Sequence, residues 1–131
     1  MSMLIVGTES KEVHILEPSG MAIKKTHTFK SVPCFLQCTG QLDVDHRIFV
    51  ACRDGKVYVI KNGEIMPDPV FSIESKPVGL LLFEKQLVIA GMNSTLHSFY
   101  LKGKKNFALA MPSNIVDISK IEVKRSQQGG G

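Results

Sequence analysis

A threefold internal repeat constrains the fold of this chain more than any other feature of its sequence. Val13, Val57 and Leu96 occupy equivalent positions, 44 and 39 residues apart. The segments that align around them are 4–16, 48–60 and 87–99. A period of 20 to 50 residues is typical of solenoids, propellers and other repeat architectures.

Each repeated segment has the pattern of a β-hairpin. An apolar run ends at a small residue, Gly7, Ala51 or Ala90, and a polar turn and a second apolar run follow. The Asp54-Gly55 turn favours the positive φ angles of a type I′ hairpin, and Asn62-Gly63 marks a further turn. The pattern predicts strands near 4–8, 12–17, 47–53, 56–61, 87–91 and 95–101.

The segments between the hairpins also repeat. Residues 31–36 match residues 75–80, and residues 114–118 follow 39 positions later without the proline. Another short strand is predicted before each of these segments, within 22–29, 70–73 and 107–110. Four antiparallel strands in 40 to 45 residues are typical of a propeller blade, whereas leucine-rich and helical repeats need a helical periodicity that this chain lacks.

Apolar residues on both faces of the predicted strands support the propeller fold. Ile48 and Val50 alternate with Phe49, where a strand with one solvated face would alternate apolar and polar residues. A blade is packed on both faces by its neighbours, which explains this pattern. The chain has no tryptophan, so it is not an ordinary WD40 sequence.

The repeats predict an incomplete propeller. Residues 1–124 supply about three blades, and the first blade starts at its second strand, at Leu4. Closed propellers have four to eight blades. We therefore expect the remaining blades to belong to a longer parent chain or to a second chain. Residues 125–131 are polar and glycine-rich and are predicted to form a flexible tail.

Four stretches of the sequence, in their order and spacing, resemble one known family. These stretches are 4–9, 43–58, 76–80 and 101–105. They are similar to the N-terminal β-propeller of the family of the first Bardet–Biedl syndrome protein, a subunit of the BBSome. The resemblance extends from about Leu4 to Ile121.

This resemblance implies a function in protein transport. The BBSome is a coat-like complex that moves membrane proteins in and out of cilia, and the propeller of this subunit docks a GTP-bound ARF-like small GTPase. The implied partners are that GTPase and the other BBSome subunits, with the membrane contacted indirectly. The implied locations are the cytoplasm, the cilium, its basal body and the periphery of the ciliary membrane. The alternative is a propeller interaction module of another trafficking, tethering or intraflagellar-transport complex.

A lysine cluster is the candidate partner contact. Lys102, Lys104 and Lys105 surround Gly103 in a predicted hairpin turn. Such a cluster forms either a solvated turn or a contact for an acidic partner; the pairs Lys24-Lys25 and Lys124-Arg125 are weaker clusters. With a net charge of only +4 and no aromatic residues interleaved with the lysines, binding of nucleic acid is disfavoured.

The sequence offers no catalytic, cofactor-binding or metal-binding motif. It has no G-x-S-x-G, Walker A or G-x-G-x-x-G pattern, so we expect no enzyme and no cofactor. The remaining enzymatic alternative, a propeller with catalytic groups clustered at its central channel, has no motif in its favour. Asp43 and Asp45 could bind a cation, but a solvated loop is favoured. The first residues do not form a signal peptide, and no apolar run spans a bilayer, which makes the cytosol the default compartment.

The histidines and cysteines are expected to have structural roles. His14 and His97 occupy the repeat position of Tyr58, which favours packing between strands over metal binding. Zinc spacings such as H-x-x-x-H and C-x-x-C are absent. The three cysteines are Cys34, Cys38 and Cys52. The first two would lie about 13 Å apart along one strand, too far for a disulfide, so reduced thiols are expected.

Overall fold

All regular elements in the described part of the chain are β-strands. The computed structural model describes residues 4–17, 22–39 and 47–121. The first sheet contains β1 (Leu4–Gly7), β2 (Glu12–Leu16) and β3 (Ile23–Thr28). The second contains β4 (Pro33–Thr39), β5 (Arg47–Cys52), β6 (Lys56–Lys61), β7 (Glu64–Ile65) and β8 (Phe71–Ser72). The third contains β9 (Pro77–Phe83), β10 (Gln86–Gly91), β11 (Thr95–Tyr100) and β12 (Lys105–Ala110).

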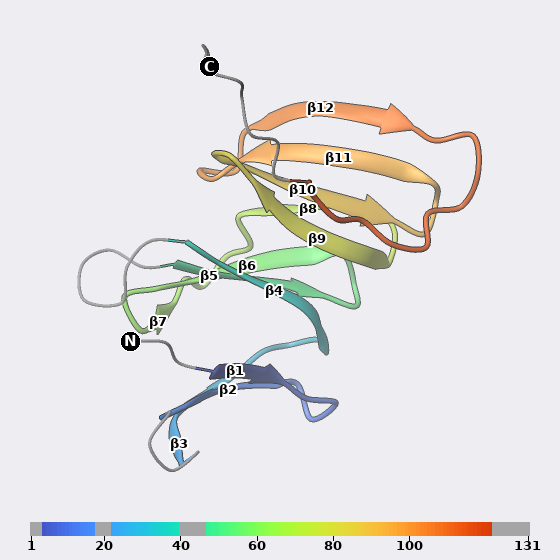
Figure 1. Ribbon diagram of the computed structural model, residues 1–131. Coiled ribbons are helices and arrows are strands. Elements are labelled where there is room, and N and C mark those ends of the chain that lie inside the picture. Colours follow the sequence, from blue (N-terminus) through green and yellow to red (C-terminus); the bar gives the residue numbers. More distant parts are fainter. Residues whose placement is uncertain (1–3, 18–21, 40–46, 122–131) are drawn as a thin grey trace.

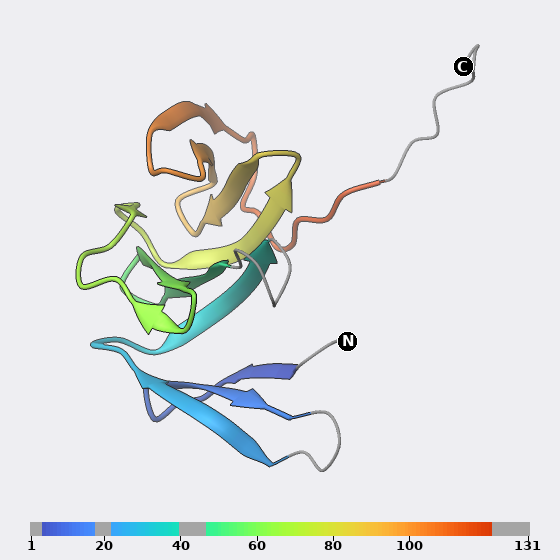
Figure 2. The same ribbon diagram turned by 90° about the vertical axis from the view of Figure 1, so that its left-hand side faces the viewer.

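The three sheets stack as successive blades of a propeller (Figures 1 and 2). Within each sheet, the paired strands are antiparallel and follow one another along the chain, except that β7 and β8 both pair with β6. The first strands of the second and third sheets, β4 and β9, contact each other, and β1 contacts β4. The fold is therefore an incomplete β-propeller of about three blades, as the repeat predicts.

The first sheet begins at the second strand of its blade. Its order, β1-β2-β3, corresponds to β5-β6-β8 and to β10-β11-β12 in the repeat. No described strand corresponds to β4 or β9 at the free edge of β1. Among the described residues, the first sheet thus lacks the inner strand that β4 and β9 supply in the other two sheets.

Two apolar cores lie between the sheets, and β5 contributes to both. Phe49 and Ala51 join the core shared with the third sheet, whereas Ile48 and Val50 join the core shared with the first sheet. Because successive side chains of a strand point to opposite faces, a central blade must be apolar on both faces. Burying a side chain as large as Phe49, which is completely inaccessible, contributes about 2 to 3 kcal/mol to stability.

The outward faces of the first and third sheets expose apolar side chains. On the first sheet these are Leu4, Val6 and Ile23, and on the third they are Phe83, Tyr100, Phe107 and Leu109. Strand register places each of these two sets on a single face. Each terminal sheet therefore has an apolar face without a covering sheet among the described residues.

The hairpin turns follow the sequence prediction. Gly55 has φ +89° between β5 and β6, and a Cβ atom there would lie 2.3 Å from the carbonyl oxygen of Ile73. Asn62 and Gly63 both have positive φ between β6 and β7, as a type I′ turn requires. The six predicted hairpin strands all form, with ends displaced by at most one or two residues.

The prediction of a strand at residues 114–118 is wrong. This segment carries the sequence pattern of an inner strand, but it has no strand assignment. It instead runs beside β9, where Ile118 packs against Gly79 and Lys120 Nζ lies 3.5 Å from the carbonyl oxygen of Leu82. A strand needs a hydrogen-bonded neighbour on its ladder, and no described strand pairs with this segment. The predicted domain boundary at residue 124 and the tail lie outside the described residues.

Candidate partner-binding site

The predicted lysine cluster lies on the hairpin between β11 and β12. Gly103 has φ +100°, its amide donates to the carbonyl oxygen of Tyr100 at 2.8 Å, and the Tyr100 amide donates to the carbonyl oxygen of Lys104 at 2.8 Å. This tight turn leaves Lys102, Lys104 and Lys105 exposed.

The same hairpin packs against the second sheet. A Cβ atom at Gly103 would lie 2.5 Å from the carbonyl oxygen of Val70, so only glycine permits this close approach. The contact holds Lys102 beside the second blade. The hairpin is thus a fixed part of the seam between two blades.

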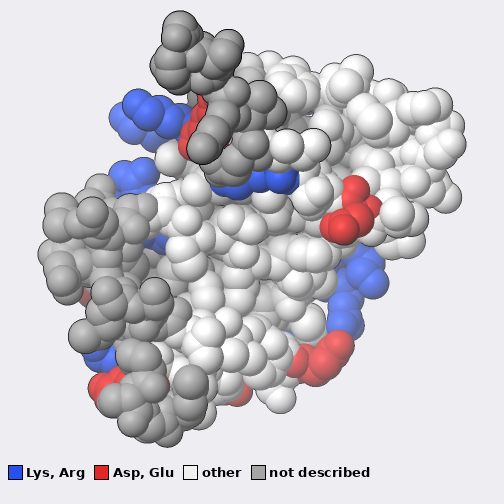
Figure 3. All heavy atoms as spheres, viewed as in Figure 1, with Lys and Arg blue, Asp and Glu red and all other residues white. Residues whose placement is uncertain are grey.

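Strand direction brings several other basic residues to the same end of the blades. Lys24 and Lys25 lie near the start of β3, Arg47 begins β5, Lys61 ends β6, and Lys85 lies in the turn before β10. Figure 3 shows several Lys and Arg groups along the left-hand side, where Figure 1 places the turn between β11 and β12. This end of the blades therefore combines a mild positive potential with exposed turns.

A pocket of about 260 Å³ lies at this basic end, between the second and third sheets. Its lining consists of Arg47, Val59, Lys61, Val70, Leu101 and Lys102. The three apolar residues belong to or pack against the core between the sheets, whereas Lys61 and Lys102 are exposed at the rim. The lining contains no carboxylate, thiol, imidazole or hydroxyl group that could act in catalysis. The pocket is therefore suited to bind a group in which an apolar part lies next to an anionic part.

Sequence reasoning identified Lys102 but not Arg47 and Lys61. Their position in the predicted hairpin could have identified these two residues, because Arg47 and Lys61 are directly paired at one end of the β5–β6 ladder. Equivalent ends of neighbouring blades lie side by side, so the turn at Lys102 meets this pair. Lys104 and Lys105 do not line the pocket.

Two histidines that share one repeat position, His14 and His97, contact residues of their own sheets. His14 Nδ1 lies 2.8 Å from Thr26 Oγ1 and its Nε2 lies 3.5 Å from Glu12 Oε1. His97 stacks on Phe99 with ring centroids 6.3 Å apart, and its buried Nε2 atom has no hydrogen-bond partner. Burial, assisted by the nearby Lys105, lowers the pKa of His97. The ring is therefore favoured in its neutral form.

The three cysteines carry free thiols. Burial, together with smaller effects of Asp54 and Cys34, raises the pKa of Cys52 to about 12, so this residue is a protonated core side chain at neutral pH. The structure groups no three His, Cys, Asp or Glu residues that could hold a metal ion within its described ranges. Asp43 and Asp45 lie outside those ranges. Within them, no helix has the length and apolar character that crossing a membrane requires.

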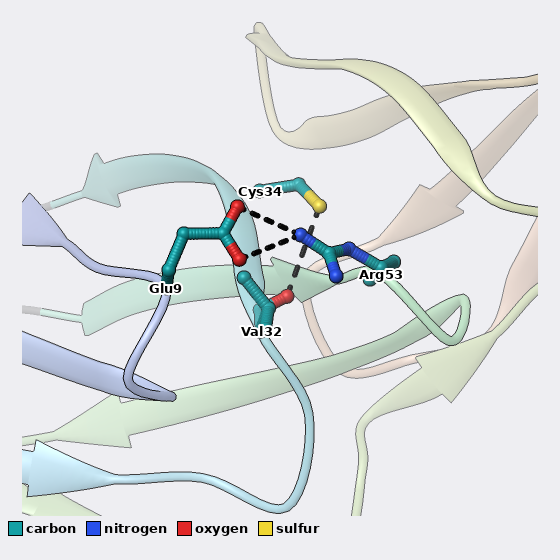
Figure 4. A network of polar contacts seen from close by, with 4 residues as sticks. All are labelled: Glu9, Val32, Cys34 and Arg53. Carbon is teal, nitrogen blue, oxygen red and sulfur yellow. Dashed lines mark hydrogen bonds and ion pairs between the residues drawn. The ribbon is translucent and has the colours of Figure 1, made fainter.

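The end of the blades opposite the basic end has a more balanced set of charges. Figure 4 shows Arg53 Nη2 donating to both carboxylate oxygens of Glu9 at 2.9 Å, and the Cys34 thiol 3.7 Å from the carbonyl oxygen of Val32. Arg53 and Glu9 are both substantially exposed. This ion pair joins two blades. It is a structural contact, since Glu9 neutralises the charge of Arg53 within the chain.

The propeller fold also appears in comparisons with solved structures. The chain superposes on BamB from Moraxella catarrhalis with a TM-score of 0.65 over 83% of this chain and 33% of that chain, at 14% sequence identity. That likeness concerns the fold alone. The class is thus a β-propeller, built from repeated antiparallel blades.

The more specific likeness is to one subunit of the BBSome. The family model described as ciliary BBSome complex subunit 1 matches residues 1–61. The chain is 37% identical over 121 residues to mouse BBSome complex member BBS1 and 36% identical over 122 residues to the human protein. These alignments cover 92% and 93% of this chain, but the chain spans only about a fifth of the length of these relatives.

A crystal structure of BBS1N in complex with ARL6DN gives the matching structural comparison. It superposes with a TM-score of 0.83 at 38% identity, over 93% of this chain and 39% of that chain. Sequence, family model and structure therefore agree. They confirm the resemblance of this chain to the N-terminal propeller of BBSome subunit 1.

Proposed function

We propose that this chain forms part of a non-catalytic subunit of a ciliary membrane-protein coat, the BBSome. Its propeller, once complete, docks an ARF-like small GTPase in the GTP-bound form. The observation that carries the proposal is the 38% identical, closely superposing BBS1N structure, which was crystallised with ARL6DN. The other proposed partners are further BBSome subunits and the remaining propeller blades.

Recognition of the GTP form has a direct physical basis. The γ-phosphate and Mg²⁺ order the switch loops of a GTPase. A rigid surface of packed blades binds ordered loops without reorganising, whereas the GDP form loses conformational entropy on binding. The propeller supplies shape and charge, and the nucleotide chemistry belongs to the GTPase. Recruitment by the GTPase then brings the complex to the periphery of the ciliary membrane, so the propeller contacts the membrane only indirectly.

The lysine cluster is proposed as a contact for an acidic partner. Lys102, Lys104 and Lys105 are exposed on one rigid hairpin at the basic end of the blades. Their charges attract an acidic surface and raise the rate at which it associates.

Calorimetric titration tests the GTPase proposal. The chain is completed with the missing blades, in the same polypeptide or as a second chain, and is titrated with an ARF-like GTPase loaded with a non-hydrolysable GTP analogue or with GDP. We expect binding of the GTP form and at least tenfold weaker binding of the GDP form. Equal affinity for both forms would contradict the effector function.

A further inference from the structure

We propose that the pocket between the second and third blades binds a peptide segment in which one large apolar side chain is flanked by carboxylates. This proposal does not depend on the GTPase. It assigns a second, separate partner class to the basic end of the blades, on the basis of the pocket's shape, its apolar floor and its charged rim.

The floor of the pocket offers a rigid apolar surface. Val59 is only 7% exposed and belongs to the core between the blades, and the partly buried Val70 and Leu101 pack against that core. The backbone amides of Met66 and Val70 donate to the carbonyl oxygens of Val59 and Val57 at 3.0 and 2.8 Å, which fixes the segment that carries Val70. A preformed apolar site binds without the entropic cost of ordering itself.

The volume of the pocket favours a side chain over a small-molecule ligand. Pockets that bury drug-sized ligands have volumes of about 300 to 1,000 Å³. The value of about 260 Å³ lies below that range. The lining also offers no aromatic ring on which a nucleotide base could stack.

The rim of the pocket is positively charged from both blades. Lys61 approaches from the second blade and Lys102 from the third, with Arg47 paired directly with Lys61 in the ladder. Among the described residues, the carboxylates on the neighbouring elements are Glu64 on β7, Asp68 between β7 and β8, and Glu84 in the turn after β9. None of these three lines the pocket. An acidic segment therefore finds complementary charge on both sides of the apolar floor, the arrangement that basic clusters use to recognise acidic motifs.

Fluorescence anisotropy tests the proposal with a defined probe. The probe is a fluorescein-labelled peptide of sequence Asp-Glu-Phe-Glu-Asp, titrated with the 131-residue chain, and a second peptide has alanine in place of phenylalanine. The test variant is Lys61→Glu with Lys102→Glu. The matched control, Lys56→Glu with Lys76→Glu, makes the same change of net charge at the opposite end of the blades, where both lysines are also exposed.

We expect the test variant to weaken binding of the phenylalanine peptide at least tenfold and the control to change it less than twofold. The alanine peptide should bind at least fivefold more weakly than the phenylalanine peptide. Far-UV circular dichroism establishes that both variants retain the β-structure of the parent chain. The titration of the completed, unsubstituted propeller with the GTPase is a separate measurement, so failure of one proposal is distinguishable from failure of the other.

Three results would overturn the proposal. The first is absence of peptide binding by the unsubstituted 131-residue chain. The second is equal weakening by the test and control variants, or equal binding of the two peptides, which would indicate non-specific attraction of charge. The third is binding of phosphatidylserine vesicles that the test variant abolishes and that the peptide does not compete with, which would assign the basic end to a membrane surface.

Discussion

Glu9 and Arg53 occupy the same position in two successive repeats, 44 residues apart, and form an ion pair with each other across the seam between the first and second blades. The contact follows from the architecture, because blades that stack in parallel bring equivalent turns side by side. The third repeat has Met92 at this position, so the pair is made once among the three described repeats. The ion pair therefore links the first blade to the second.

Arg53→Ala should lower the stability of the chain only slightly. Both partners are exposed, and ion pairs of this kind contribute about 0 to 1 kcal/mol, even with two charge-assisted hydrogen bonds. Thermal melting followed by circular dichroism measures the effect, and the loss should shrink at high salt because the charges are screened. Lys56→Ala, on the neighbouring strand, is the control. A loss several times larger than that range would show that the ion pair is not acting as a surface contact.

Gly55→Ala should destabilise the chain by more than Gly63→Ala. Both glycines have φ near +90°, so both substitutions introduce a strained backbone conformation. At Gly55 the new Cβ atom would also lie 2.3 Å from the carbonyl oxygen of Ile73 and 2.9 Å from that of Ser75. At Gly63 its nearest neighbour is Nζ at the far end of the Lys25 side chain, 3.4 Å away.

The matched pair isolates the cost of the backbone clash at Gly55. We expect Gly55→Ala to cost on the order of 1 kcal/mol or more beyond the loss in Gly63→Ala, measured as a difference in melting midpoint between the two variants. Equal melting midpoints would mean that the turn after β5 rearranges to accommodate the new Cβ atom without a loss of stability. The close packing of that turn against the segment before β9 would then not contribute to stability.

The stability of the chain should fall as the pH decreases below about 6.5, the ordinary pKa of histidine. Burial lowers the pKa of His27 and of His97, with smaller contributions from Lys25 and Lys105. A lowered pKa in the folded state means that the unfolded chain takes up protons first. The stabilisation is therefore complete above the unfolded pKa and is lost as the pH falls towards the folded pKa.

Replacing His27 and His97 by glutamine should flatten this dependence. Melting midpoints measured between pH 8 and pH 5 should decrease less in the double variant than in the parent chain. The comparison of slopes does not require equal stability at pH 8, so a general destabilisation by the substitutions does not obscure the result. An unchanged slope would show that other groups govern the acid response.

The repeat predicted the hairpins but not every strand or the site. Pairs such as β5 and β6 form from residues close in sequence, and their turn chemistry and apolar pattern are visible in the chain itself. Residues 114–118 repeat the pattern of β4 and β9, but a strand also needs a partner, which the pattern of one segment cannot reveal. The pocket joins Lys61 to Lys102 across two blades, and its existence depends on how the blades pack.

A polar network in the third blade also depends on contacts between strands that the sequence pattern does not reveal. Val59 and Ser98 are equivalent in the repeat, yet Ser98 is fully buried and polar. Its hydroxyl donates to Gln86 Oε1 at 2.5 Å, and Asn106 Nδ2 donates to the same oxygen at 2.7 Å. Three residues from three adjacent strands must come together to satisfy the buried hydroxyl group. The equivalent position in the second repeat holds the apolar Val59.

The 131-residue chain should associate in solution through its two outward blade faces. Phe107 is 43% exposed and Leu109 is 52% exposed on one side of the third sheet, and Leu4 and Val6 are exposed on the first sheet to a similar extent. Contiguous apolar surface of this kind drives association, because burying it against another apolar face removes it from water.

Charged substitutions on one of these faces test the prediction. Phe107→Lys combined with Leu109→Lys should reduce the mass measured by multi-angle light scattering, whereas Met92→Lys should not. Met92 is 57% exposed but lies in the turn between β10 and β11, away from the sheet face. Supplying the missing blades should have the same effect as the double substitution, because a neighbouring sheet then covers the face. A parent chain that is monomeric and unfolds cooperatively would instead show that three blades suffice as a folded unit, with their outward faces stable in water.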